Sequence, residues 1–196
     1  MATRLTRAER GEQTRAELLA AARAEFLDAG YHGATLDRIA AAAGYTKGAV
    51  YSRYASKADL FLDLLEARID ARAADNERRA DALVGVAGLT ELLVHWRATD
   101  REDQAWTLLV MEFRIHAARD PALNARYAAL HERTIAGVAR TLERVLGAAA
   151  DPGVARTVLA IGTGTTLEHV TGPDRLSAEK VARVVAALVD DTPARS

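Results

Sequence analysis

Apolar residues recur every three or four positions through most of this 196-residue chain, which is the spacing of one buried helix face. The first such stretch runs from about residue 11 to 29 and stops at Gly30, a residue that tolerates the left-handed conformation of a helix end. Three more stretches follow at 35–43, 46–51 and 56–79, and they open on the N-cap residues Thr35, Thr46 and Ser56. The pattern therefore predicts four helices in the first 80 residues, two of them very short.

The helical pattern continues through the rest of the chain. Helices are predicted at about 89–98, 102–118, 122–146, 152–170 and 177–189, with glycine or proline breaks between most of them. The composition is rich in Ala, Leu, Arg, Glu and Asp and includes only 4 Pro, which also favours helices. We expect an all-α fold of about nine helices.

Composition narrows the class of protein. Hydrophobic residues make up 49% of the chain, enough apolar material for a sizeable core. The absence of Cys excludes disulfides and thiolate chemistry, and the arginine-containing amino terminus lacks the apolar segment of a signal peptide. There is also no run of about 18 uncharged apolar residues, so we expect a cytoplasmic protein without a membrane partner.

Charge divides unevenly along the chain. The net charge is −1, but residues 1–60 hold nine Lys or Arg against seven Asp or Glu and are therefore near +2. The remainder is near −3. This mild asymmetry has the sign expected of a nucleic-acid-binding amino-terminal part.

The segment from Thr35 to Lys57 has the layout of a helix-turn-helix, because two short helices flank a turn that contains Gly44. The second helix opens on Thr46, Lys47 and Gly48, where free N–H groups and the positive end of the helix dipole favour phosphate. Aromatic hydroxyls and cations follow at Tyr51, Arg53, Tyr54 and Lys57. Such groups can bond to phosphate oxygens beside a major groove.

These residues carry a resemblance to a known family. From Thr14 to about Glu66 the chain resembles the amino-terminal domain of the TetR family of bacterial transcriptional regulators, in the stretches LLAAARAEFLDAGYHGATL and DRIAAAAGYTKGAVYSRYASKADLF. Tyr54 stands where the family usually has Phe, and Arg53 where His is common. The resemblance implies a helix-turn-helix DNA-binding domain at 1–58 and a helical ligand-binding and dimerisation domain at 59–196.

We predict double-stranded operator DNA as a partner. The predicted contacts are Thr35, Thr46, Lys47, Gly48, Tyr51, Tyr54 and Lys57. The alternative is a solvated basic face with a half-buried tyrosine. Thr35 has a structural role as an N-cap in either case, and the ring of Tyr54 is expected to pack in the three-helix core whatever its hydroxyl does.

Two further groups of residues are predicted in the second domain. A small-molecule pocket is expected among aromatic and polar side chains of the central helices: Trp96, Trp106, Met111, Phe113, His116, Tyr127 and His131. For any one of them, simple core filling is an equal alternative. The last two helices are expected to pair with those of a second copy as a four-helix bundle through Val158, Ile161, Val185 and Leu188.

Motifs for catalysis or metal binding are missing from the sequence. Glu112 and His116 are four residues apart on one predicted helix, but a hydrogen-bonded pair explains them better than a metal site. There is no H-E-x-x-H, G-x-S-x-G, P-loop or Rossmann pattern. We therefore predict no enzyme, cofactor or metal, and instead a homodimeric regulator, a repressor that an unknown small-molecule effector releases from a palindromic operator. The alternatives are a regulator that answers no ligand and a small-molecule-binding helical protein with a degenerate helix-turn-helix.

Overall fold

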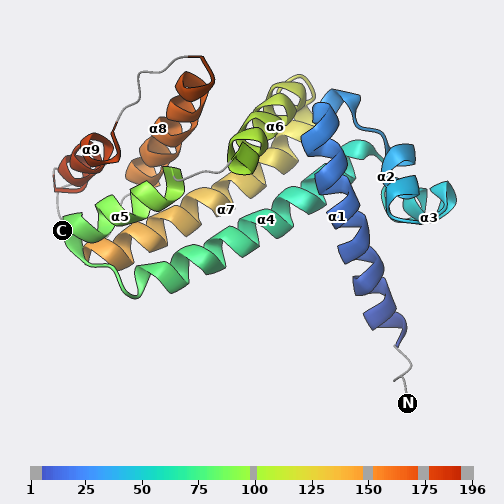
Figure 1. Ribbon diagram of the computed structural model, residues 1–196, viewed down its shortest axis with the longest axis horizontal. Coiled ribbons are helices and arrows are strands. Elements are labelled where there is room, and N and C mark those ends of the chain that lie inside the picture. Colours follow the sequence, from blue (N-terminus) through green and yellow to red (C-terminus); the bar gives the residue numbers. More distant parts are fainter. Residues whose placement is uncertain (1–5, 98–100, 148–151, 172–176, 191–196) are drawn as a thin grey trace. The chain divides into compact units, whose positions relative to one another are not determined.

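The computed structural model describes residues 6–97, 101–147, 152–171 and 177–190. These residues form nine helices and no strand, which confirms the all-α prediction (Figure 1). None of the described helices is long and apolar enough to cross a membrane. The helices are α1 (Arg7–Gly33), α2 (Leu36–Ala42), α3 (Lys47–Tyr51), α4 (Lys57–Ala80), α5 (Gly85–Arg97), α6 (Arg101–Ala117), α7 (Pro121–Leu146), α8 (Pro152–Thr171) and α9 (Ala178–Asp190).

The first helix is longer at both ends than its apolar pattern predicted. It begins after Thr6, because Thr6 and Glu9 form a capping box in which each side chain accepts a hydrogen bond from the backbone N–H of the other. Near its end, Gly30 has φ 70° and ψ 172°, so the helix is interrupted there as expected, yet one more turn follows to Gly33. The apolar stripe covers only the part of α1 that is buried.

The chain divides into two compact units. The first contains residues 1–67 and 109–124, and the second contains residues 68–108 and 125–196. The domain boundary expected from sequence lay at residue 58. The pattern did not indicate that residues 109–124, from the end of α6 and the start of α7, would pack with the amino-terminal helices.

An aromatic cluster forms the centre of the first unit. Phe26 of α1 meets Phe61 of α4 edge to face, with ring centroids 5.1 Å apart. Phe113 of α6 lies 4.4 Å from Phe61 and 5.0 Å from Tyr31. The rings of Phe26, Phe61 and Phe113 are fully buried, so α6 completes this core instead of merely lying on it.

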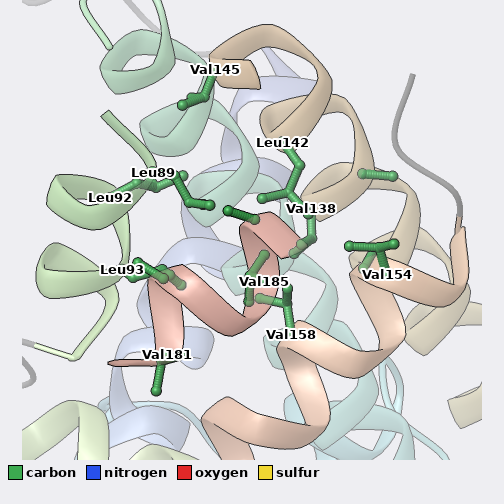
Figure 2. Packing of buried hydrophobic residues seen from close by; sticks show 14 of the residues in the cluster. Leu89, Leu92, Leu93, Val138, Leu142, Val145, Val154, Val158, Val181 and Val185 are labelled. Atoms are coloured by element: carbon green, nitrogen blue, oxygen red, sulfur yellow. The ribbon is translucent and has the colours of Figure 1, made fainter. Parts of the chain in front are cut away.

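The second unit has its own hydrophobic core, built from α5, α7, α8 and α9 (Figure 2). Leu89 and Leu92 of α5 and Leu142 of α7 are fully buried there. The last helix, α9, lies against α5 and α8 and turns Val181 and Val185 into this core. The part of its apolar face that carries Val181 and Val185 is therefore covered within a single chain.

Candidate nucleic-acid interface

The turn between α2 and α3 has the geometry of a helix-turn-helix. Gly44 adopts φ 74°, and its N–H bonds to the carbonyl of Ala41, while the N–H of Tyr45 bonds to that of Ala40. The Tyr45 hydroxyl reaches α1, where it bonds to the carboxylate of Glu17. The turn is thus anchored to the long first helix, which sets the direction of α3.

One side of α3 is buried and the other is exposed. Val50 is fully buried in the first unit, whereas Thr46, Lys47, Gly48, Ala49 and Tyr51 are exposed. The Thr46 hydroxyl caps the helix by accepting a hydrogen bond from the N–H of Ala49, as predicted. The exposed residues form a continuous face of a helix whose orientation is fixed by Val50.

Lys47 lies at the start of α3 and forms an ion pair with Asp37 of α2. The hydrogen bond from Lys47 to this carboxylate raises the pKa of the ammonium group, which is therefore charged at neutral pH. Both side chains are exposed. A phosphate at this position would compete with Asp37 for the ammonium group.

Thr35 and Tyr51 also lie on the surface of the first unit. The Thr35 side-chain oxygen accepts a hydrogen bond from the N–H of Arg38 and caps α2, which confirms its predicted structural role. A hydroxyl that accepts one bond can still donate another. The Tyr51 side chain is 52% exposed, so its hydroxyl can reach a partner of α3.

Lys57, a predicted DNA contact, bonds to the backbone of its own chain. Its ammonium group donates to the backbone carbonyls of Tyr31 at 2.5 Å, His32 at 3.1 Å and Ala34 at 2.9 Å. An ammonium group has three donors, so these carbonyls at the end of α1 use them all. Burial lowers the pKa of Lys57. The structure therefore assigns Lys57 to holding the end of α1, and we leave it out of the phosphate contacts.

The Tyr54 side chain also faces inward. It is 5% exposed, and its hydroxyl donates a 2.6 Å hydrogen bond to the carboxylate of Asp63 on α4. Burial, together with this carboxylate, raises the pKa of Tyr54 to about 12. The ring packs as expected, and the hydroxyl bonds within the protein instead of facing DNA.

The residues of the predicted pocket are divided between the two units. Met111, Phe113 and His116 belong to the first unit, whereas Trp96, Trp106, Tyr127 and His131 belong to the second. Phe113 is part of the aromatic core, which is the alternative that the sequence left open. In the second unit, the indole N–H of Trp96 donates to Asn76 at 2.8 Å, and the guanidinium of Arg68 lies 4.9 Å from the ring centre of Trp106.

A hollow of about 170 Å³ lies elsewhere in the second unit, where α4 ends and α5 passes it. None of the predicted pocket residues lines it; its walls are Arg79, Ala82, Leu83, Glu91, Leu92 and His95. Among the residues that the structure describes, no group of three or more His, Asp or Glu side chains is placed to hold a metal ion.

The residues predicted for dimerisation differ in how far their side chains are buried within one chain. Val158 is 5% exposed and Val185 is fully buried, so both contact the core of their own chain, and Ile161 packs partly buried against that core. Leu188 is 39% exposed. The prediction needs correction at Val158 and Val185, because these two side chains already lie in the core of their own chain.

Parts of the chain are similar in sequence to two proteins named as transcriptional regulators. The chain is 43% identical over 59 residues to FasR, an HTH-type transcriptional activator of Mycolicibacterium smegmatis. The aligned stretch covers 30% of this chain and 27% of FasR. It is 30% identical over 114 residues to AcnR, an HTH-type transcriptional repressor of Corynebacterium glutamicum, covering 58% of this chain and 56% of AcnR. The chain thus matches about a quarter of the length of FasR and little more than half of that of AcnR.

Solved structures resemble the fold over nearly the whole chain. A transcriptional regulator from Streptomyces coelicolor has a TM-score of 0.70 at 21% identity and covers 90% of this chain and 98% of its own. EbrR, described as a multidrug binding protein and solved in complex with imidazole, has a TM-score of 0.65 at 26% identity, covering 92% of this chain and 96% of its own.

Two family models match the sequence and together take in most of it. Residues 18–64 match the model for bacterial regulatory proteins of the tetR family, and this matched segment includes α2, the turn and α3. Residues 78–191 match the model for a tetracyclin repressor-like carboxy-terminal domain. The two matches take in the helix-turn-helix and the helices that follow it, and the chain belongs to the tetR family of bacterial regulatory proteins.

Proposed function

We propose that this protein is a homodimeric repressor that binds a palindromic operator through α3 and leaves it when a small molecule binds. The exposed face of α3, oriented by the buried Val50, is the observation that carries the proposal. It offers the Thr46 hydroxyl, the Lys47 ammonium group and the Tyr51 phenol to DNA, and the Thr35 hydroxyl lies at the start of α2. Gly48 lets the backbone approach the groove closely. Operator DNA as the partner implies a cytoplasmic protein.

A single α3 is too short to supply operator affinity by itself. It has five residues, of which one is buried, so each copy of the chain reads few base pairs. Two copies related by a two-fold axis would place two such helices in major grooves about 34–36 Å apart, or a multiple of that spacing. This requirement supports a homodimer and a palindromic site.

The outward surfaces of α8 and α9 are the proposed dimer contacts. Leu167 of α8 and Val184 and Leu188 of α9 are large apolar side chains that remain exposed in one chain. Burying such residues against a second copy is favourable by roughly 25 cal/mol per Å² of apolar area. The pairing therefore uses the exposed edge of the apolar face of α9, beside the buried Val185.

Effector control is proposed to act through α6. This helix contributes residues 101–108 to the second unit and residues 109–117 to the first. In the first unit, Phe113 is buried in the aromatic core and Glu112 bonds to the backbone of Tyr31. Suppose that α6 can adopt two placements. A ligand that binds the protein more tightly in one of them would shift the first unit toward the corresponding state. The ligand-binding relative EbrR supports an effector of this kind, whose identity stays open.

The test begins with a gel shift on the DNA upstream of the protein's own gene, with a scrambled duplex of equal length as the control. Selective binding by a dimer, seen in sedimentation of the complex, is the expected result. A thermal-shift panel of small molecules then identifies compounds that stabilise the protein and release the DNA. A reporter gene behind the bound site should rise in expression when the protein is removed; a fall would make it an activator, as FasR is named.

If DNA binds selectively and no compound alters it, the regulator that answers no ligand is the better description. If stabilising compounds are found while neither duplex is bound selectively, the small-molecule-binding protein with a degenerate helix-turn-helix takes its place. The two alternatives thus fail on different measurements.

A further inference from the structure

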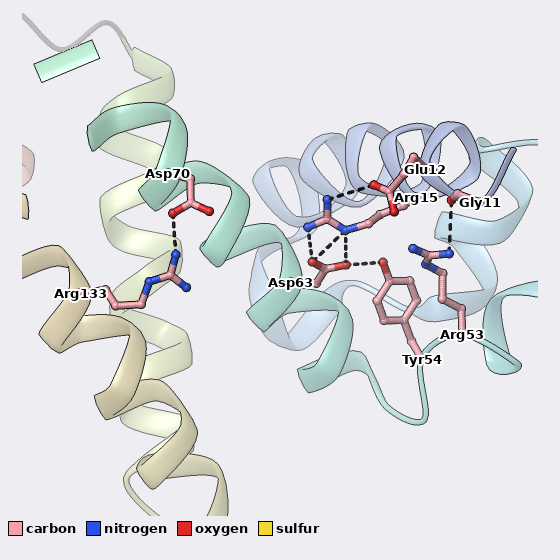
Figure 3. Close-up of polar contacts among 8 residues, drawn as sticks. All are labelled: Gly11, Glu12, Arg15, Arg53, Tyr54, Asp63, Asp70 and Arg133. Carbon is pink, nitrogen blue, oxygen red and sulfur yellow. Dashed lines mark hydrogen bonds and ion pairs between the residues drawn. The ribbon is translucent and has the colours of Figure 1, made fainter. Parts of the chain in front are cut away.

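A polar cluster links three segments of the first unit (Figure 3). Asp63 of α4 accepts two hydrogen bonds of 3.1 Å from the Arg15 Nε and one of 2.5 Å from its terminal nitrogen. The same carboxylate accepts the 2.6 Å hydrogen bond from the Tyr54 hydroxyl. Helix α1, the link from α3 to α4 and α4 itself are thereby joined at one carboxylate.

The cluster has a defined charge state. Burial disfavours the charged form of Asp63, but the hydrogen bonds from Arg15 and Tyr54 outweigh it and keep the pKa below its ordinary value of 3.8. Tyr54 is neutral at physiological pH and can only donate to this acceptor. The phenol is therefore held in one orientation, with its ring fixed beneath the residue that precedes it.

That preceding residue is Arg53, which is exposed. Its guanidinium carbon lies 6.0 Å from the centre of the Tyr54 ring, and its NH1 donates a 3.3 Å hydrogen bond to the backbone carbonyl of Gly11 on α1. A guanidinium has five N–H donors, more than the Gly11 bond uses. Arg53 is thus held from two sides and still has donors to offer.

Charge compensation separates Arg53 from the two nearby lysines. The Lys47 ammonium group is paired with the Asp37 carboxylate, and the Lys57 ammonium group is bonded to three backbone carbonyls at and just after the end of α1. Arg53 instead bonds to a neutral carbonyl. The Arg53 charge acts on the Asp63 carboxylate, but that carboxylate is hydrogen-bonded to Arg15, so a phosphate could bind Arg53 without displacing a bonded anion. A guanidinium matches phosphate oxygens in a bidentate arrangement.

We propose that Tyr54 and Asp63 are positioning residues for DNA binding: they hold Arg53 so that its guanidinium meets a backbone phosphate beside α3. The inference rests on the proposed DNA-binding role of this face. Tyr54 replaces the Phe that is usual in the family, and Asp63 provides the acceptor that its additional hydroxyl requires. The Tyr54 hydroxyl, which departs from the family pattern, thus has its hydrogen-bond acceptor in Asp63.

A double-mutant cycle tests the proposal. Wild type, Arg53→Ala, Tyr54→Phe and the double variant are titrated against a duplex that the wild-type protein selects from a random-sequence pool, and against its scrambled counterpart. Arg53→Ala should weaken both by roughly tenfold and lower the salt slope of log K by about 1.8 for two half-sites. Tyr54→Phe keeps the ring but removes its anchor, so it should weaken binding several-fold in the wild-type background. In the Arg53→Ala background it should change nothing.

Two further variants make the cycle specific. Asp63→Leu removes both acceptor oxygens with little change in side-chain size and should reproduce Tyr54→Phe, including its dependence on Arg53. Arg119→Ala removes an exposed arginine that follows α6 and should leave the affinity and the salt slope unchanged. Thermal unfolding of every variant confirms that the compared proteins are folded at the titration temperature.

Two results would overturn the inference. If Tyr54→Phe weakened binding equally with and without Arg53, the cluster would serve the fold alone. If Tyr54→Phe left the affinity unchanged while Arg53→Ala lowered it, Arg53 would need no positioning. A wild-type protein that selected no duplex at all would instead refute the proposed function, and the inference with it.

Discussion

The carboxylate of Glu112 on α6 accepts a 2.8 Å hydrogen bond from the backbone N–H of Tyr31, the residue that follows the interruption of α1 at Gly30. The two residues are 81 positions apart in the chain. A Cβ added at Gly30 would lie 3.0 Å from the same carboxylate oxygen. The break in α1 and the approach of α6 therefore depend on a glycine at this position.

Gly30→Ala is expected to lower the free energy of unfolding by about 1–3 kcal/mol, because φ 70° with ψ 172° is a region that residues with a Cβ avoid. Urea unfolding measures the change. The matched control is Gly11→Ala in the same helix, where an added Cβ meets no atom within 4 Å. That variant should gain about 0.5–1 kcal/mol. A neutral Gly30→Ala would show that α1 can straighten without loss.

Glu112→Ala is expected to lower the free energy of unfolding by about 1 kcal/mol, since the N–H of Tyr31 loses its acceptor. Glu112→Gln keeps an acceptor oxygen at the same place and should lose less. Hydrogen exchange at the Tyr31 amide provides the local measurement, and it should accelerate in the Ala variant first. Equal exchange in all three proteins would mean that this hydrogen bond is not maintained in solution.

Replacing the two lysines by Met should separate their roles. Lys47→Met removes an exposed cation from the start of α3 and should lower the salt slope of operator binding by about 1.8 for a dimer, with little loss of stability. Lys57→Met removes the donors to three carbonyls and should destabilise the protein with no change in salt slope. Salt titrations and thermal unfolding of both variants decide the matter. A lower salt slope for Lys57→Met would show that Lys57 contacts a phosphate after all.

Asp63 should make the free energy of unfolding decrease at acid pH. Its pKa is lower in the folded protein than its ordinary value of 3.8, so the unfolded chain binds its proton more tightly. The stabilisation is complete above pH 3.8 and is lost as the pH falls through the folded value. Asp63→Asn should be less stable by about 1–3 kcal/mol at neutral pH and lose less on acidification. Urea unfolding across this pH range tests it, and parallel curves for the two proteins would contradict it.

Two substitutions on α9 should have opposite effects. Leu188→Glu places a charge on an exposed edge of the helix and should convert dimer to monomer. Val185→Ala creates a cavity in the core of one chain and should lower stability by about 1–3 kcal/mol without monomerising the protein. Sedimentation velocity and thermal unfolding are the measurements. A dimer that survived Leu188→Glu would move the interface to another surface.

The helices and the helix-turn-helix could be predicted from the sequence, because their signals are local. The caps at Thr35 and Thr46 bond to N–H groups three residues away, and the glycine at position 44 adopts the positive φ that its turn requires. The core position Val50 follows from the same spacing. Interactions between residues so close in the chain need no knowledge of the rest of the fold.

The surfaces that cover each helix face, and the groups that each charged side chain contacts, could not be predicted from the sequence. Lys57 lies among the cationic residues of the motif, but its ammonium group turns toward carbonyls at the end of α1. An apolar stripe on α9 signals burial without naming the partner, and the partner of Val185 is α5 and α8 of the same chain. Glu112 and Phe113 join the first unit from α6. The periodicity of a helix specifies which side chains share a face, whereas the covering surface depends on contacts between residues far apart in sequence.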